Sequence, residues 1–522
     1  MENTLKRALD KAWGSTCRVL FGQELGELEE YGDWLGEYLP KTTKRKSHVS
    51  GKEVILAKDA YPTEARFISA DELAMNKSYA LDINQIKDID SLIEALQEKC
   101  EYTGNRALGN SAFVESSDII LDSQYVYNST NVEQSSYIYS SYMMRRGSKN
   151  VFGSGWTANG DFLVRVIAGI NLHRCFESHF VSDSGDLYFC FNCDACHDAL
   201  FSFGQKNKHR IIGNLTLQKD KYAQLKAKLL AEVVERLKKQ KKFASLYGLV
   251  PDKAPASLPH IGLGHGKEET SMGTIETAFS STFEIIMKRK SPGIGALEGW
   301  LSEDTIELEE VKTPFGDETY APLNFGVVSD MPRKRLVTTD ESFELGKISL
   351  DEKSLSSLDL LIDSLDKIAF FCAGYSQGHN LNIIKSPLIL HSINVYKGYE
   401  STYSENTGLT SLSLHSKYVY GCNRIIDSQF CLKCHNSLYL NRCLELDASL
   451  KCSDSYFCHN CEGLSDAMFC FNVKGKRHII GNTELPKEKY LEIKEALLGQ
   501  LNDELEKSKT LGRSIFSIGS LK

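Results

Sequence analysis

Small or apolar residues recur at every third position between residues 416 and 473. The members of this frame are Ser416, Val419, Cys422, Ile425, Ser428, Cys431, Cys434, Ser437, Leu440, Cys443, Leu446, Ser449, Cys452, Ser455, Cys458, Cys461, Leu464, Ala467, Cys470 and Val473. No charged or aromatic residue falls in the frame, and every cysteine of the segment does. Chance would place eight cysteines in one frame about once in two thousand trials. The frame therefore predicts a tight interior, with polar and aromatic side chains on the other faces.

A period of three excludes the two commonest regular structures. A straight strand turns alternate residues to one face, and an α-helix repeats every 3.6 residues, so neither keeps this register. A bundle of polyproline-type helices has three residues per turn but needs glycine at its axis, where this frame has Ser, Val and Cys. We therefore predict a β-solenoid with very short sides and a narrow core.

The first half of the chain contains a similar tract with one interruption. Large and small residues alternate at every third position from Val114 to Met144. The frame then slips by one residue at Arg145-Arg146-Gly147 and continues from Ser148 to Ser202. We interpret the slip as a bulge or a corner loop.

The two tracts belong to two copies of one longer unit. Tyr188-Phe189-Cys190-Phe191-Asn192-Cys193 returns as Tyr456-Phe457-Cys458-His459-Asn460-Cys461, and Ile211-Ile212-Gly213-Asn214 returns as Ile479-Ile480-Gly481-Asn482. Internal repeats of this kind predict a tandem duplication, with copies near 1–248 and 270–522.

Each copy is predicted to contain the same elements in the same order, which makes the fold class α+β. Residues 1–112 and 270–381 are mixed segments that open with a helix, Asn3 to Leu20 or Thr274 to Met287. Residues 113–248 and 382–522 are solenoids closed by an amphipathic helix whose apolar face covers coil ends or sheet edges. Residues 249–269, which are rich in proline and glycine, are a linker outside the core. A duplicated chain further predicts that the copies pack as a pseudo-twofold pair.

Composition places the chain among ordinary globular proteins. It has 522 residues, a formal net charge of -8 and 42% hydrophobic residues, which argues against a nucleic-acid binder acting over its whole surface. Neither a secretory signal nor an apolar run long enough for a membrane span is seen. Fifteen cysteines without an export signal indicate a reducing compartment, so we expect a cytoplasmic location and no membrane partner.

The end of the second copy resembles a known group of sequences. Residues 469–482 (FCFNVKGKRHIIGN), followed by Pro486-Lys487-Glu488-Lys489-Tyr490, are similar to the end of cysteine-rich hypothetical proteins with tandem CxxC motifs, found in uncultivated prokaryotes and phages and often labelled as CoA-transferases. The resemblance covers mainly residues 420–495, and the first copy departs from it in having far fewer cysteines. It supports the predicted fold and implies no activity.

The cysteines permit two interpretations. Cys190, Cys193, Cys458 and Cys461 form CxxC pairs that both copies retain, which is the spacing of zinc or iron–sulfur ligands. Other slots exchange cysteine for Ser, Leu or Val between the copies, which is typical of packing positions. The packing interpretation implies no cofactor, and the ligand interpretation implies zinc or an iron–sulfur cluster.

Two basic turns occupy equivalent places near the ends of the tracts. Their cations are Lys206, Lys208 and Arg210 in the first copy and Lys474, Lys476 and Arg477 in the second. Charged edges of this kind prevent aggregation of repeat proteins, and they also suit contact with an anion or a phosphate backbone.

No nucleophile elbow, P-loop or HExxH motif is seen, so no catalytic residue is assigned. The sequence favours a non-catalytic scaffold that binds protein partners through aromatic-rich faces. The alternatives are a zinc or iron–sulfur protein, a nucleic-acid or ribonucleoprotein contact through the basic turns, and an enzyme with its site in the mixed segments. The sequence leaves the oligomeric state open.

Overall fold

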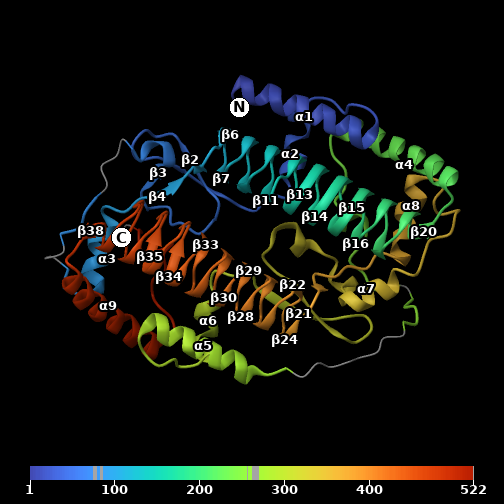
Figure 1. Ribbon diagram of the computed structural model, residues 1–522. Coiled ribbons are helices and arrows are strands. Elements are labelled where there is room, and N and C mark those ends of the chain that lie inside the picture. The colour runs from blue at the N-terminus through green and yellow to red at the C-terminus, as the bar shows by residue number, and fades with distance from the viewer. Residues whose placement is uncertain (75–78, 83–85, 256, 262–269, 521–522) are drawn as a thin grey trace.

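The computed structural model describes residues 1–74, 79–82, 86–255, 257–261 and 270–520. Figure 1 shows two long stacks of short strands that lie side by side and run in opposite directions. The first stack spans residues 107–216 and the second spans residues 375–484. Helices and irregular segments surround both stacks.

The strands of the first stack are mostly four residues long. They are β5 (Ala107–Leu108), β6 (Ala112–Glu115), β7 (Asp118–Leu121), β8 (Gln124–Tyr127), β9 (Thr130–Glu133), β10 (Ser136–Tyr139), β11 (Tyr142–Arg145), β12 (Lys149–Phe152), β13 (Gly155–Val164), β14 (Ile167–Phe176), β15 (His179–Tyr188), β16 (Phe191–Asp194), β17 (His197–Leu200), β18 (Phe203–Lys206), β19 (His209–Ile212) and β20 (Leu215–Thr216).

The second stack is built from strands of similar length. They are β23 (Tyr375–Gln377), β24 (Leu381–Ile384), β25 (Leu388–Leu390), β26 (Ile393–Tyr396), β27 (Tyr399–Thr402), β28 (Glu405–Gly408), β29 (Ser411–Leu414), β30 (Lys417–Tyr420), β31 (Asn423–Ile426), β32 (Gln429–Leu432), β33 (His435–Leu438), β34 (Asn441–Asp447), β35 (Ser453–His459), β36 (Ser465–Met468), β37 (Arg477–Ile480) and β38 (Thr483–Glu484).

The strand register explains the period of three. Pairing is parallel except in the short hairpins β19–β20 and β37–β38, and most residues pair with the residue 12 positions further on, as in Lys417↔Gln429. Every third residue has a positive φ, for example 57° at Ile119, 48° at Asp122 and 56° at Tyr125. Each left-handed residue bends the chain, so 12 residues make four bends. The residue after each bend points inward, which is how residues three apart share one interior.

Serine and cysteine occupy the interior because their side chains can form hydrogen bonds with the backbone carbonyl and amide groups there. The Ser117 hydroxyl donates to the Glu115 carbonyl (2.7 Å) and accepts the Ser129 amide one repeat later (3.0 Å). Cys422 makes the same two contacts, donating to the Tyr420 carbonyl (3.5 Å) and accepting the Cys434 amide (3.3 Å). A polar group inside a narrow core is tolerated only when it is hydrogen-bonded in this way.

The slip predicted at residues 145–147 is confirmed. Before it, Ser136 pairs with Gln124, a separation of 12. Across it, Ser136 pairs with Lys149 and Tyr142 with Gly155, a separation of 13. One extra residue is therefore inserted into one repeat, and Gly147 adopts a φ of 83° there.

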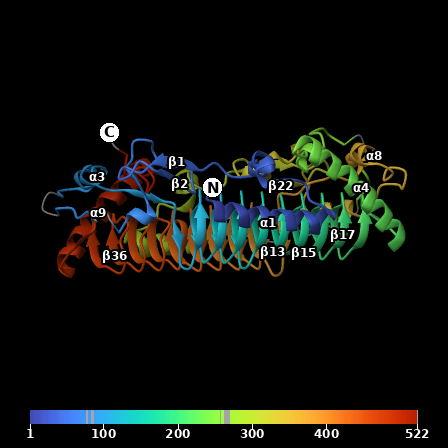
Figure 2. The same cartoon turned by 90° about the horizontal axis from the view of Figure 1, so that it is seen from above.

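Helices cover the outer sides of the stacks and the segments that join them. They are α1 (Asn3–Phe21), α2 (Gly32–Gly36), α3 (Ile89–Gln97), α4 (Lys219–Gln240), α5 (Met272–Met287), α6 (Ile294–Ser302), α7 (Thr339–Leu345), α8 (Leu358–Ser364) and α9 (Lys487–Ser508). Figure 2 shows α1 running along several consecutive strands of the first stack. The Tyr188 hydroxyl donates to the Leu20 carbonyl of α1 (2.8 Å), and the Tyr456 hydroxyl donates likewise to Ile286 of α5 (3.0 Å).

The mixed segment of each half packs on the stack of the other half. Residues 43–104 contain β1 (Thr43–Lys46), β2 (Glu53–Leu56), β3 (Phe67–Ser69), β4 (Tyr102–Gly104) and α3, and they share one apolar core with the second stack. Residues 308–373 contain β21 (Leu308–Lys312), β22 (Glu318–Pro322), α7 and α8, and they share a core with the first stack.

We call residues 43–104 and 308–373 the exchanged segments, because each packs on the stack of the other half. The contacts that they make are equivalent. The Leu81 amide donates to the Gly481 carbonyl (3.1 Å), and the Leu350 amide donates to the Gly213 carbonyl (2.9 Å). Ile89 and Leu358 begin α3 and α8, and each donates its amide to a side chain of the closing helix, at Gln500 and Glu232 (both 2.8 Å). The closing helices α4 and α9 contact β19 and β37, as predicted for sheet edges, but the exchanged segments also cover these stack ends.

Part of the predicted linker lies outside the described residues, namely 256 and 262–269. Val250, at its start, belongs to the apolar core of the first stack, so the linker begins inside the core rather than outside it. None of the described helices is long and apolar enough to cross a membrane.

Candidate functional site

The retained CxxC cysteines lie inside the narrow interiors. Cys190 and Cys193 are buried in the first stack, and Cys458 and Cys461 are buried in the second. Each thiol donates to the carbonyl two residues earlier, for example Cys458 to Tyr456 (3.3 Å). Burial raises the pKa of the Cys193, Cys458 and Cys461 thiols above the ordinary value, which keeps these three groups protonated and unreactive.

Among the described residues, no group of three or more His, Cys, Asp or Glu side chains is arranged to hold a metal ion. The structure therefore contributes no ligand set to the zinc or iron–sulfur prediction, which remains a prediction. The burial and hydrogen bonding of the thiols agree with the packing interpretation.

The two basic turns are exposed near the ends of the stacks. Their cations, Lys206, Lys208, Arg210, Lys474, Lys476 and Arg477, all face solvent. Several have acidic neighbours in the chain: Lys474 lies 2.9 Å from Glu462 and Lys476 lies 2.8 Å from Glu484. Exposed pairs of this kind contribute little to stability. Contact with nucleic acid through these turns remains a prediction.

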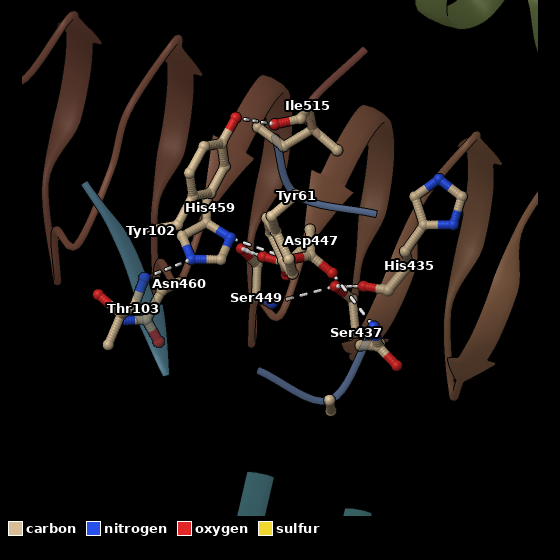
Figure 3. A network of polar contacts seen from close by, with 12 residues as sticks. Tyr61, Tyr102, Thr103, His435, Ser437, Asp447, Ser449, His459, Asn460 and Ile515 are labelled. Carbon is tan, nitrogen blue, oxygen red and sulfur yellow. Dashed lines mark hydrogen bonds and ion pairs between the residues drawn. The ribbon is translucent and has the colours of Figure 1, made fainter. Parts of the chain in front are cut away.

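A buried polar network joins the first mixed segment to the second stack (Figure 3). Asp447 Oδ2 accepts from the Tyr61 hydroxyl (2.6 Å) and lies 2.9 Å from His459 Nδ1. The Thr103 amide donates to His459 Nε2 (3.0 Å), so the ring is neutral and carries its proton on Nδ1. Burial lowers the pKa of His459 despite the nearby carboxylate. Burial opposes the charge on Asp447, but His459, Arg106 and Tyr61 together outweigh burial and lower the pKa of Asp447.

This network resembles the hydrogen-bonded Tyr, Asp and His side chains of active sites, but its geometry is that of a structural joint. Both ring nitrogens of His459 are hydrogen-bonded, and Asp447 Oδ1 accepts from the side-chain amide of Asn436 (3.2 Å). A general base needs an open lone pair within reach of a substrate proton. We therefore assign the network to holding the exchanged segment on the stack.

A buried carboxylate lies at the same place in each half. In the first, Arg165 Nε lies 2.7 Å from Glu177, whose other oxygen accepts from the Tyr38 hydroxyl and the Leu246 amide. In the second, Lys433 lies 3.6 Å from Glu445, whose Oε2 accepts from the Ile515 amide (2.9 Å). Arg165 and Lys433 both donate to the carbonyl of an equivalent tryptophan, Trp34 or Trp300.

The two stacks meet along a face where one cavity of about 150 Å³ is found among the described residues. Its lining includes Thr130, Asn131 and Tyr142 from the first stack and Arg424 and His435 from the second. Lys58 and Phe325, from the two exchanged segments, also line it. Side chains from all four parts of the fold therefore converge at this point.

Sequence reasoning missed these buried sites because it treated the residues outside the period-three frame as exposed decoration. Arg424, Lys433, His435 and Glu445 are at most 2% exposed. The other stack, the helices and the exchanged segments cover them. A signal was present, since charged residues recur 12 positions apart at 433 and 445, one repeat length.

Comparisons with known proteins place no external constraint on this site. No family model, no curated protein and no solved structure matches the chain.

Proposed function

We propose that the chain is a tandem duplication of a module with a period-three β-solenoid, and that it serves as a non-catalytic scaffold for protein partners. The 12-residue parallel register supports the solenoid, and the equivalent contacts of the exchanged segments support the duplication. A duplicated pair related by a pseudo-twofold axis would arise from a symmetric dimer.

One observation carries the scaffold proposal: a row of exposed aromatic rings on the second stack. The rings of His391 and Tyr403 are 4.8 Å apart and those of Tyr403 and His415 are 5.1 Å apart, with interplanar angles of 4° and 2°. Tyr403 is 52% exposed, and Tyr439 further along the stack is 51% exposed. Aromatic side chains are enriched at protein interfaces. Rings held in place by the strand register lose little freedom on binding.

The first stack has its own row of stacked rings, Phe113, Tyr125 and Tyr137, and further along it has a row of amides. There Asn159 donates to Asn171 (2.8 Å), and Asn171 donates to Asp183 (2.8 Å). Amide rows satisfy one another and stabilise a parallel stack, so they leave fewer groups for a partner. Tyr125 and Tyr137 pack against the core of the first stack, whereas Tyr403 is 52% exposed, so the scaffold proposal assigns the contact surface to the second stack.

The proposal can be tested by cross-linking in the native host followed by mass spectrometry. Tyr403→Ser should remove the specific partners that the unmodified chain captures, whereas Asn171→Ser, in the amide row of the first stack, should leave them unchanged. Both variants must first show the thermal stability of the unmodified chain. Equal capture by both variants would contradict the proposal, and so would a captured set no different from that of an unrelated control protein.

A further inference from the structure

The cavity between the stacks contains a group of buried polar atoms without partners. Within the described residues, no hydrogen-bond partner is found for Thr130 Oγ1, Asn131 Oδ1, Tyr142 Oη, Arg424 Nε and Nη1, or either ring nitrogen of His435. All five side chains line the same cavity, and each residue is at least nine-tenths buried. A buried polar group without a partner costs about 1–3 kcal/mol. Five side chains with such groups around one cavity indicate a site in which a polar ligand would supply the missing hydrogen bonds.

Arg424, which lines the cavity, has a chemically different counterpart in the first stack. Trp156 of the first stack stands 268 residues before Arg424, the same separation that relates Tyr188 to Tyr456. Trp156 donates its indole N–H to Glu400 of the second stack (2.7 Å) and packs on Phe325 and Tyr399. At this position of the first stack an aromatic side chain packs on Phe325, which also lines the cavity. At the counterpart position of the second stack, the cation Arg424 lines the cavity.

The charges around the cavity favour an anion. Arg424 lines the cavity and has one acidic contact, a bond from Nη2 to Glu133 (2.8 Å), while no partner is found for its Nε and Nη1 among the described residues. Burial, together with the nearby Arg145 and Arg106 cations, lowers the pKa of Arg424 to about 10. An oxyanion bound to the free N–H groups of Arg424 would offset both the cost of burying its charge and the repulsion from the neighbouring cations.

The remaining groups narrow the chemistry of the ligand. Tyr142 and Thr130 offer hydroxyl donors, which suit a second oxygen of an anion. Asn131 Oδ1 is an acceptor, and it needs a hydroxyl or amine on the ligand. Burial lowers the pKa of His435 to about 3, so its ring is neutral and has one donor and one acceptor. The volume, about 150 Å³, suits a small molecule, since one water takes up about 30 Å³ of liquid.

We propose that this cavity binds a small oxyanion that carries a hydroxyl group, such as hydrogen phosphate or a short 2-hydroxycarboxylate, with Arg424 as its main contact. The site is separate from the exposed aromatic row, and it does not depend on the scaffold proposal. Both candidate ligands have an anionic oxygen that Arg424 can bind and a hydroxyl group that can donate to Asn131.

The test is isothermal titration calorimetry on the full chain, with three probes at matched ionic strength: inorganic phosphate, glycolate and acetate. Saturable binding of phosphate or glycolate with one ligand per chain is expected, and the tighter of the two identifies the source. Acetate, which lacks the hydroxyl, should bind at least fivefold more weakly than glycolate. No saturable binding of either hydroxyl-bearing probe at millimolar concentrations would overturn the proposal.

Three variants separate this site from general electrostatic attraction. Arg424→Met should abolish binding. Tyr142→Phe, which removes one hydroxyl without changing shape, should weaken binding about five- to tenfold. Arg442→Met removes a partly exposed arginine of the same stack that pairs with Asp454 (2.6 Å), and it should bind like the unmodified chain.

If the Arg424 variant fails to fold, Tyr142→Phe decides the matter. Unchanged affinity in Tyr142→Phe would then contradict the assignment. Equal losses in Tyr142→Phe and Arg442→Met would contradict it too.

Discussion

Glu177 and Glu445 occupy equivalent positions in the two halves, and their charge states differ. Burial opposes ionisation of both. At Glu177, Arg165, His179 and Tyr38 outweigh burial and lower the pKa to about 2. At Glu445, burial prevails over the attraction of Lys433 and raises the pKa to about 7. Glu177 is therefore ionised at neutral pH, whereas Glu445 titrates near neutrality.

The difference lies in the neighbours and not in the stack. Tyr38, which donates to Glu177, has Asp304 as its counterpart in the second half, and that carboxylate raises the pKa of Glu445 further. Lys433 is shared between Glu303 (2.6 Å), Asp304 (3.9 Å) and Glu445 (3.6 Å). Arg165 instead contacts Glu177 closely, at 2.7 Å. Two similar stacks of parallel strands therefore hold these carboxylates in similar places, and residues from other segments determine their protonation.

The largest effect should come from a charge placed inside the second stack. Ser455 is fully buried, so Ser455→Lys should cost more than about 5 kcal/mol and prevent the second half from folding, because a buried unpaired charge is very costly. Since each half covers the other with an exchanged segment, the first half should lose its near-UV circular dichroism in the same variant. A first half that stays folded would show that the halves are independent.

The control for that experiment is the neighbouring residue. Asp454 is only partly buried and forms a two-pronged ion pair with Arg442 (2.7 and 2.6 Å). Asp454→Lys should therefore cost about 1 kcal/mol, the usual value of such a pair, rather than nothing. If Ser455→Lys and Asp454→Lys both melt like the unmodified chain, the assignment of inward positions is wrong.

The next largest effect should separate the two buried pairs. Arg165→Met leaves Glu177 charged and unpaired in the interior, which should lower the free energy of unfolding by about 3–5 kcal/mol. Lys433→Met should cost about 1–2 kcal/mol, because Glu445 can take up a proton at a smaller cost. Urea unfolding at pH 7, followed by tryptophan fluorescence, measures both. Equal losses of unfolding free energy in the two variants would show that Glu177 and Glu445 have the same ionisation state.

A smaller effect is expected from pH. The pKa of Glu445 rises from 4.5 in the unfolded chain to about 7 in the folded one, so the native state binds more protons between these values. Stability contributed by this group is therefore complete below about pH 4.5 and falls as pH rises through 7, by about 3 kcal/mol at most. Glu177 acts in the opposite sense, since its contribution is present above pH 4.5 and is lost as pH falls toward 2.

Comparison of the unmodified chain with Glu445→Gln isolates this effect. The glutamine variant should lose less stability than the unmodified chain between pH 5 and pH 8 in urea unfolding. Parallel pH profiles would mean that Glu445 is ionised throughout this range.

The smallest effect should follow a cut in the linker. A protease site engineered at 257–261, where Leu258 is 46% exposed, divides the chain between the halves. The cleaved halves should elute together on gel filtration, because each exchanged segment remains packed on the other half. They should separate only in denaturant. Halves that separate in buffer after cleavage would rule out the exchanged arrangement.

The sequence predicted the α+β composition and the inward-facing residues of the two strand-rich tracts well, because inward positions depend on local spacing. The frame identified the inward residues and the inserted residue near Gly147, and amphipathic spacing identified the helices that begin and end each half. It could not predict the exchange of the mixed segments or the cavity between the stacks. These depend on contacts such as Tyr61 with Asp447 and Arg424 with Glu133, between residues 386 and 291 positions apart. A period along one chain segment carries no information about which other segment covers its outer faces.

The exchange of the mixed segments affects how the protein is made. Residues 43–104 leave the ribosome early, but Tyr102 donates its hydroxyl to Ile515 (2.7 Å), close to the end of the chain. At a synthesis rate of about 5–20 residues per second, this segment waits about 20–80 seconds for its partner. During that time its apolar residues, including Val54, Leu92 and Leu96, are without the core that covers them in the finished protein. This early segment therefore stays exposed until the second stack has been synthesised.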